Sequence, residues 1–215
     1  MTDGGKIAAE FAAPGKLEIT RRDGTRATLA ADAVPAPRPG PGPFAVTFDP
    51  KWGAPAGPQQ FAKLTSWTES ADPGIRHYSG LAVYKKTLSV PAAELAPGTR
   101  VYLEIEEVRE VAGVFINGKS AGTLWRPPYR LDVTGHIKAG QNALEIKVAG
   151  TWVNRCLYDA TLPESERLTW ANSMRTHYPD PATVKPSNYP WKHGPLPSGL
   201  IGEMRLVYTQ TAIAP

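Results

Sequence analysis

Residues 100–155 read RVYLEIEEVREVAGVFINGKSAGTLWRPPYRLDVTGHIKAGQNALEIKVAGTWVNR, and this stretch decides the fold. Hydrophobic and polar residues alternate on both sides of Asn117-Gly118, the dipeptide that best supplies the two positive φ angles of a type I′ hairpin turn. An aromatic and basic turn follows at 125–130, and another alternating segment over 143–148 comes after a Gly-Gln-Asn turn. Alternation with a period of two between tight turns predicts antiparallel strands.

The same alternation recurs outside this stretch, at 44–48, 81–90 and 204–208. The chain of 215 residues also holds 22 prolines and 20 glycines, which interrupt helices and favour turns. Short strands separated by turn signals predict an all-β fold, an antiparallel β-sandwich, rather than a parallel α/β sheet. The segment 157–197 has almost no periodicity, so we expect a long irregular loop there.

The first 42 residues follow a different pattern. For residues 1–16 we expect either little order or an extension of a sheet edge. A small hairpin is predicted over 17–29, with Asp23-Gly24 as its turn. Proline then occupies every second or third position from 34 to 43, which is typical of an extended linker. The chain therefore divides into an N-terminal extension with a hairpin and a proline-rich linker, residues 1–42, and a β-sandwich domain, residues 43–210.

The amino-acid composition limits the kinds of partner that the chain is expected to bind. Hydrophobic content of 41% and charged content of 20% are those of a globular protein. The net charge is only +4, and the lysines and arginines are scattered among acidic residues along the chain. We therefore expect no nucleic-acid groove. No run of 18 apolar residues exists, so we expect no membrane span, and the first 20 residues carry no signal-peptide pattern. The chain as it stands would be cytoplasmic, whereas a piece of a larger protein could be periplasmic or secreted.

Most catalytic and metal-binding patterns are missing from the sequence. The histidines are well separated and form no HxH or HExxH pattern, so we expect no metal; a structural calcium is the alternative, although no dense acidic loop marks one. Phosphate-binding glycine loops and a GxSxG elbow are absent, and we expect no cofactor. Carboxylates Glu104 and Glu106 lie on the polar side of a strand, where a solvated face is the simpler interpretation. Loop acids Asp159 and Glu69 are the candidates for acid–base catalysis.

Aromatic residues in predicted loops give the stronger functional signal. Sugars present flat CH faces that lie against aromatic rings, and their hydroxyl groups need polar partners such as arginine, asparagine and aspartate. Some tryptophans could instead fill the sandwich core. The residues that combine both kinds of side chain, and that we predict to bind a ligand, are Trp125, Arg126, Tyr129, Trp152, Asn154, Arg155, Asp159 and Trp170.

A series of short motifs in a particular order resembles a known family. The motifs are TSWTE at 65–69, GIRHYSG at 74–80, VFINGK at 114–119, GTLWRPPY at 122–129, WVNR at 152–155 and LPSGLIG at 196–202. This order is similar to that in the C-terminal β-sandwich of glycoside hydrolase family 106, the α-L-rhamnosidases, over about residues 43–208. The core is also similar to the sugar-binding domain of family 2 glycosidases.

The resemblance implies a galactose-binding-like jelly roll. In that family the catalytic carboxylates belong to a large barrel-type domain upstream, which 215 residues leave no room for, because a barrel needs about 250 residues. Three functions follow as hypotheses. The first is a carbohydrate-binding sandwich that recognises plant or microbial glycans through its aromatic loops. The second is a small stand-alone glycoside hydrolase that uses Asp159 and Glu69. The third is a structural domain that docks on a glycosidase catalytic domain.

Overall fold

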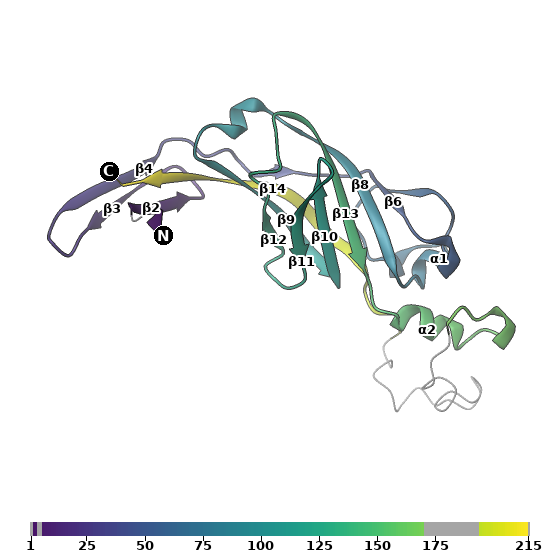
Figure 1. Ribbon diagram of the computed structural model, residues 1–215. Helices are drawn as coiled ribbons and strands as arrows, with labels where there is room; N and C mark the ends of the chain where they lie inside the picture. The colour runs from purple at the N-terminus through teal and green to yellow at the C-terminus, as the bar shows by residue number, and fades with distance from the viewer. Residues whose placement is uncertain (1, 4–5, 170–193, 215) are drawn as a thin grey trace.

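The computed structural model describes residues 2–3, 6–169 and 194–214 (Figure 1). Two antiparallel sheets pack face to face in the centre of the molecule, which confirms the predicted all-β sandwich. A smaller set of strands extends from one end of the sandwich, and helix α2 (Val153–Asp159) lies at the opposite end. The result is an elongated molecule whose sandwich lies between these two attachments.

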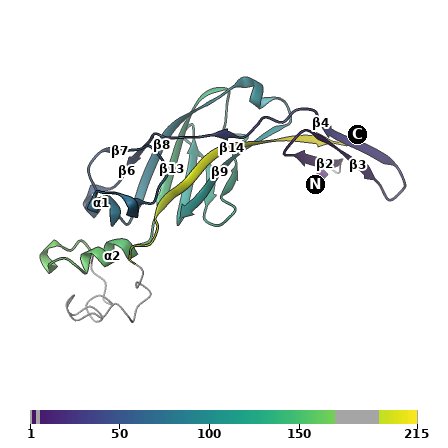
Figure 2. The ribbon, with the colours of Figure 1, turned by 180° about the vertical axis from the view of Figure 1, so that it is seen from behind.

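The first sheet is built around the long strand β14 (Gly199–Ile213). Its order is β1 (Thr2–Asp3), β2 (Lys6–Phe11), β14, β9 (Thr99–Arg109) and β12 (Arg130–Asp132), and β5 (Arg38–Pro39) also pairs with β14. Figure 2 shows β14 running from the sandwich into the N-terminal strands. We predicted a last strand over 204–208 only; the observed strand is longer because it has partners along its whole length, β9 first and then β2.

The second sheet holds the hairpin that the sequence predicted at Asn117-Gly118. Its order is β11 (Lys119–Leu124), β10 (Val111–Ile116), β13 (Gly140–Ala149), β8 (Leu81–Val90), β6 (Phe44–Thr47) and β7 (Pro58–Phe61). Asn117 has φ 53° and Gly118 has φ 79°, as a type I′ turn requires. The Asn117 side chain also bonds outside the turn: its Nδ2 donates to Asn142 Oδ1 at 2.9 Å, and its Oδ1 accepts from the backbone N–H of Ala143 at 3.1 Å.

The core lies between the two sheets, where the alternating residues of each strand point inward. Trp67, in the 3-10 helix η2 (Trp67–Glu69), is fully buried there and donates from Nε1 to the hydroxyl of Tyr84 at 2.5 Å. Fully burying a large apolar side chain stabilises a fold by about 1.5–3 kcal/mol. The largest fully buried side chains include Trp67, Tyr78, Tyr84, Tyr208, Phe44 and Phe48.

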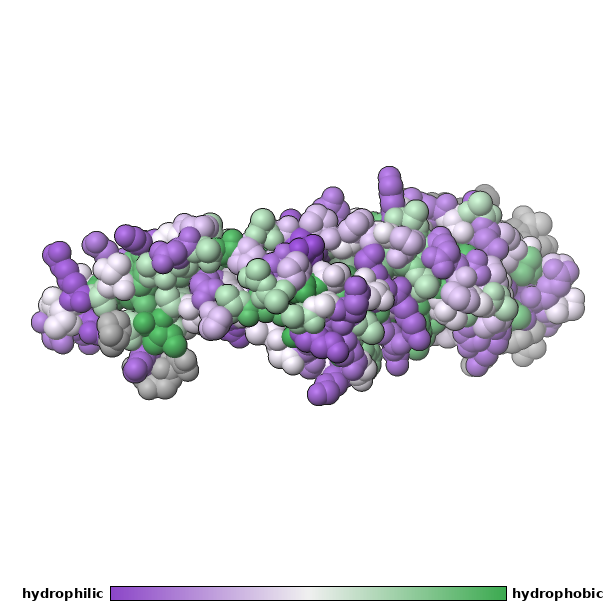
Figure 3. All heavy atoms as spheres, turned by 90° about the horizontal axis from the view of Figure 1, so that it is seen from above, coloured by the Kyte–Doolittle hydropathy of each residue, from purple (hydrophilic) through white to green (hydrophobic). Residues whose placement is uncertain are grey.

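The N-terminal strands form a small unit with its own core. Strands β3 (Gly15–Thr20) and β4 (Arg26–Ala31) make the predicted hairpin, and Gly24 in its turn has φ 83°. Leu29 and Ala27 are buried against Ala214, the residue that follows β14. Figure 3, seen from above, shows hydrophobic surface at this end of the molecule as well. Strand β2 extends the edge of β14, which is one of the two outcomes expected for residues 1–16. The division at residue 42 stays a prediction, because β14 and β5 tie this unit to the sandwich.

Short helices cover the end of the sandwich opposite the N-terminal strands. They are η1 (Pro50–Trp52), α1 (Pro73–Arg76), α2 and η4 (Glu164–Glu166), and η3 (Ala92–Leu95) lies in the turn between β8 and β9. The predicted irregular loop was placed from residue 157, but Leu157–Asp159 continue a helix. Residues 170–193 of that loop lie outside the described part of the chain.

Candidate functional site

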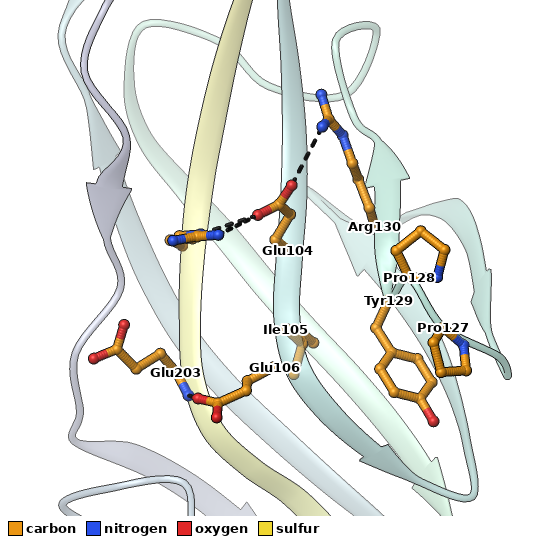
Figure 4. A pocket seen from close by; sticks show the side chains of 9 residues that line it. Glu104, Ile105, Glu106, Pro127, Pro128, Tyr129, Arg130 and Glu203 are labelled. Atoms are coloured by element: carbon orange, nitrogen blue, oxygen red, sulfur yellow. Dashed lines mark hydrogen bonds and ion pairs between the residues drawn. The ribbon is translucent and has the colours of Figure 1, made fainter. Parts of the chain in front are cut away.

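A pocket of about 360 Å³ lies on the outer face of the sheet formed by β14, β9 and β12 (Figure 4). The even-numbered residues of β9 point outward here, because the odd-numbered ones are buried in the core. The pocket therefore has charged side chains from three strands, β9, β12 and β14, and an apolar wall from the turn that leads into β12. Its lining residues are Glu104, Ile105, Glu106, Pro127, Pro128, Tyr129, Arg130, Glu203 and Arg205.

The apolar wall is the turn 125–129, which connects β11 to β12. The peptide bond between Pro127 and Pro128 is cis, and the backbone N–H of Arg130 donates to the carbonyl of Pro128 at 2.8 Å. The carbonyl of Tyr129 accepts from the backbone N–H of Ile105 at 3.0 Å, which fixes this turn against β9. Tyr129 is half-buried against the core, so its ring is held in one place at the edge of the pocket.

Glu104 joins the two guanidinium groups of the pocket. Nε and Nη2 of Arg205 each lie 2.9 Å from Glu104 Oε2, and Nη1 of Arg130 lies 3.4 Å from Oε1 (Figure 4). The Arg130 guanidinium also lies over the ring of Tyr102, at 3.9 Å from its centroid. The sequence suggested a solvated face for Glu104, but the carboxylate is half-buried between these two arginines.

The polar network continues along β9 away from the pocket. The hydroxyl of Tyr102 donates to Glu10 at 2.6 Å, and Nη2 of Arg100 lies 2.6 Å from Asp132 Oδ2. Partial burial works to raise the pKa of Glu10, but hydrogen bonds from Thr209 and Tyr102 outweigh it and hold that pKa below its ordinary value. The outer face of this sheet is therefore a connected array of charged side chains rather than isolated surface groups.

A second polar cluster is buried around α2. Arg155 and Asp159 are four residues apart, so they lie on one side of the helix and form a buried ion pair. Asp159 also accepts from the backbone N–H groups of Leu168, at 3.2 Å, and Thr169, at 2.8 Å. Burial alone would raise the pKa of Asp159, but Arg155 and Thr169 reverse the effect and lower it.

Asn154 is the third buried polar residue of α2. Its Nδ2 donates to the carbonyl of Leu196 at 2.8 Å, and its Oδ1 accepts from the N–H of Leu196 at 2.7 Å. The N–H of Arg155 donates to the hydroxyl of Ser79 at 3.0 Å. These contacts fasten α2 to the segment before β14 and to the segment before β8. The burial of Asn154, Arg155 and Asp159 gives them a structural task, and their predicted contact with a ligand stays a prediction.

Two rings near α2 stack on each other. The ring of His77 lies parallel to that of Tyr158, with 4.4 Å between centroids. Burial, together with the positive charges of Arg76 and Arg155, lowers the pKa of His77. The imidazole is therefore held toward its neutral form, which suits stacking on a tyrosine.

The predicted aromatic residues Trp125 and Trp152 are both exposed and leave the second sheet at the same end. Leu124 pairs with Ala112, which pairs with Val148, so the segments that follow Leu124 and Val148 start two strands apart, or about 10 Å. Trp152 packs edge-on against Trp52, with 4.6 Å between centroids. Sequence reasoning missed Trp52, although an aromatic residue beside a lysine in a predicted loop was a usable signal.

The remaining predicted residues fall in different places. Arg126 is exposed, with its guanidinium 5.5 Å from the centroid of the Trp125 ring. Glu69 is exposed at the end of η2, whereas the carboxylate of Asp159 is enclosed by its donors. The two catalytic candidates thus differ completely in environment, and their roles stay predictions. Trp170 lies outside the described residues.

Within the described ranges the structure contains no group of three or more His, Cys, Asp or Glu side chains arranged to hold a metal ion. Over the same residues, no helix is both long enough and apolar enough to cross a bilayer.

Comparisons with known proteins identify the family. Residues 78–191, more than half of the chain, match the family model described as glycosyl hydrolase 2 galactose-binding domain-like, and the chain belongs to this family. A protein of Formosa agariphila named putative beta-glucuronidase is 34% identical over 207 residues, which cover 90% of this chain and 17% of that protein. A solved rhamnosidase from Novosphingobium sp. PP1Y is 35% identical with a TM-score of 0.65, and the match covers 83% of this chain and 16% of that one.

More distant structures share the fold alone. The beta-D-glucuronidase of Dictyoglomus thermophilum has a TM-score of 0.52 at 15% identity, over 81% of this chain and 28% of that one. The chain thus spans about a sixth of the length of the Formosa and Novosphingobium relatives.

Proposed function

We propose that the chain is a carbohydrate-binding domain and that a glycan occupies the pocket beside Tyr129; Trp125 and Arg126, which we predicted to bind a ligand, are not among the residues that line this pocket. The observation that carries the proposal is the composition of this pocket: an aromatic and proline wall faces carboxylates and guanidinium groups across about 360 Å³. Ligand sites in proteins combine apolar walls with a few convergent polar groups in this way. A sugar ring has both an apolar face and a rim of hydroxyl groups, which suits such a pocket.

The family supports the proposal, and so do the names of the relatives, which are glycosidases. We also propose the finer assignment to glycoside hydrolase family 106, which the similarity to a rhamnosidase supports. On this view Trp152 with Trp52 forms a second exposed aromatic surface. The helix that follows Trp152 is held in place by Asn154, Arg155 and Asp159. These three residues therefore act on a ligand only by positioning Trp152.

Titration of the isotopically labelled chain with neutral oligosaccharides, followed by two-dimensional NMR, tests the proposal. We expect the amide signals of residues 104–106 and of Tyr129 and Arg130 to shift. Tyr129→Leu, which removes the flat ring, should weaken binding at least about fivefold, since ring stacking of this kind contributes about 1–3 kcal/mol. Phe115→Leu is the matched control, because it removes a half-buried ring from the outer face of the other sheet. If Tyr129→Leu leaves the affinity for the oligosaccharide unchanged, the placement of the glycan beside Tyr129 is refuted.

A second candidate function, docking on another domain, is favoured by a different observation. Leu81 pairs with Ala149, which pairs with Val111, so three exposed apolar side chains form one row across the end of the second sheet. Leu81 is 49% exposed and Val111 is 40% exposed. Trp125, which is 64% exposed, directly follows β11, the strand that pairs with the strand of Val111. Contiguous exposed apolar residues mark interaction surfaces. We propose that this apolar row contacts the rest of a longer polypeptide. The Formosa and Novosphingobium relatives are such polypeptides, because the chain spans only about a sixth of their length.

Sedimentation analysis of the isolated chain over a concentration series tests the docking function. The uncovered apolar row should make the chain self-associate at high concentration, and the double variant Leu81→Lys with Val111→Lys should suppress it. A wild-type chain that stays monomeric throughout would count against the docking function and leave carbohydrate binding unaffected.

A further inference from the structure

We infer that the pocket beside Tyr129 selects against acidic sugars and takes neutral or amino-bearing glycans in preference to uronates. This inference rests on the proposed carbohydrate-binding function and adds the class of ligand. A relative named as a glucuronidase would suggest the opposite preference, for acidic sugars. The inference follows from the ion pairs that the charged side chains of the pocket already form with one another.

Both guanidinium groups in the pocket are engaged by one carboxylate. Arg205 donates from Nε to Glu104 at 2.9 Å, and its Nη2 lies at the same distance from the same oxygen. Arg130 lies 3.4 Å from the other Glu104 oxygen and is also placed over the Tyr102 ring, at 3.9 Å. A uronate that bound either arginine would share that guanidinium with Glu104, whose negative charge already offsets one of the two positive charges.

Two further carboxylates line the pocket without a cationic partner. Glu106 Oε2 accepts the backbone N–H of Glu203 at 3.0 Å, so its negative charge is solvated but not neutralised. Within the described residues, neither Glu106 nor Glu203 has a lysine, arginine or histidine nitrogen within ion-pair distance, and no lysine or histidine lines the pocket. Three carboxylates against two guanidinium groups leave the pocket with an excess of negative charge.

The position of these carboxylates also favours hydroxyl and amino groups. Ionised carboxylates only accept hydrogen bonds, and sugar hydroxyls and ammonium groups can donate them. A ligand carboxylate about 6 Å from one uncompensated negative charge in water is repelled enough to weaken binding about threefold, and the excess in this pocket is one such charge. The discrimination should shrink as salt is added, since the pocket is open to solvent.

The experiment compares three oligosaccharides of equal length, built from glucose, glucosamine or galacturonate, by NMR titration of the full chain at low and high salt. We expect the glucose and glucosamine oligomers to bind about threefold more tightly than the galacturonate oligomer at low salt. Glu203→Gln should reduce this ratio, and so should Glu106→Gln, whose amide oxygen can still accept the backbone N–H of Glu203. Glu145→Gln is the matched control, because that carboxylate lies on the other sheet, between Lys85 and Lys147.

The outcomes separate the two proposals. If galacturonate binds as tightly as glucose, or if Glu203→Gln and Glu106→Gln leave the ratio unchanged, the charge selection is wrong while carbohydrate binding stands. If none of the three oligomers shifts the amides of residues 104–106 and 203–205, both the selection and the proposed function are overturned.

Discussion

Replacing Asp159 by asparagine tests whether the buried cluster of α2 is a structural element. The substitution keeps the size of the side chain and removes one negative charge. In the wild type Asp159 binds the guanidinium of Arg155, the N–H groups of Leu168 and Thr169, and the hydroxyl of Thr169 at 2.6 Å. An asparagine has one acceptor oxygen and an NH₂ group, so at least one donor would face another donor. Arg155 would stay buried without its counter-ion.

The expected loss is large for a single isosteric change. Breaking a buried ion pair by removing one partner costs about 3–5 kcal/mol, and the lost hydrogen bonds are part of the same sum rather than additional to it. We expect Asp159→Asn to lower the free energy of unfolding by about 3 kcal/mol. Glu145→Gln removes the carboxylate that pairs with both Lys85 and Lys147 at a half-exposed position, and there the expected loss is below about 1 kcal/mol.

Urea unfolding followed by circular dichroism, together with hydrogen exchange of residues 153–169, measures the effect. Hydrogen exchange is needed because α2 could open separately from the sandwich, which would spare the global transition and remove the protection of its amides. The reasoning is refuted if Asp159→Asn changes the free energy of unfolding by less than about 1 kcal/mol and leaves amide protection over 153–169 unchanged.

The same pair of proteins makes a prediction about pH. The pKa of Asp159 is lowered in the folded state, so the folded state binds fewer protons than the unfolded one. Its stabilising contribution is complete above the ordinary aspartate pKa, about 3.9, and is lost as the pH falls through the lower folded value. The stability difference between wild type and Asp159→Asn should therefore be constant near neutral pH and shrink below about pH 4. A difference that grows on acidification would contradict this sign.

Three further changes test the packing of the sandwich. Gly199→Ala would place a Cβ 2.4 Å from Nε1 of Trp67, at a residue with φ +93°, so urea unfolding should show a loss of at least about 2 kcal/mol, whereas Gly118→Ala, with open space around its Cβ, should lose about 1 kcal/mol. Asn142→Ala leaves the partly buried backbone N–H and carbonyl of Lys138 without their side-chain partner and should lower stability by about 1–3 kcal/mol, read from the same assay. Burial raises the pKa of Tyr84 to about 12, so an ultraviolet titration of wild type against Tyr84→Phe should show no difference in tyrosinate absorbance below pH 11.

The parts of the fold that sequence analysis predicted depend on neighbouring residues. The Asn117-Gly118 turn is specified by two residues whose backbone angles are chemically favoured, and the alternation over 81–90 follows from one face packing on the core. The Asp23-Gly24 turn was predicted in the same way. Such signals need no knowledge of which strands become neighbours.

The parts that were not predicted depend on distant contacts. The edge-on contact of Trp52 with Trp152, and the pairing of β2 with β14, join segments about a hundred or more residues apart. Glu104 looked like a surface residue because its arginine partners come from two other strands. The i, i+4 spacing of Arg155 and Asp159 was visible in the sequence and could have indicated an ion pair, but only the packing of α2 shows that the pair is buried.

The two ends of the described chain pair side by side in one ladder, since Ala8 lies opposite Ile213 in the β2–β14 pair, and both termini lie at the same end of the molecule (Figure 1). Cross-strand neighbours of this kind are about 5 Å apart, so a linker of a few residues would join them without distorting the sheet. The chain could then be reopened at the exposed Gly118 turn and still fold as a circular permutant. The same geometry would let the whole unit be grafted into a surface loop of a host protein, since it enters and leaves through a single point.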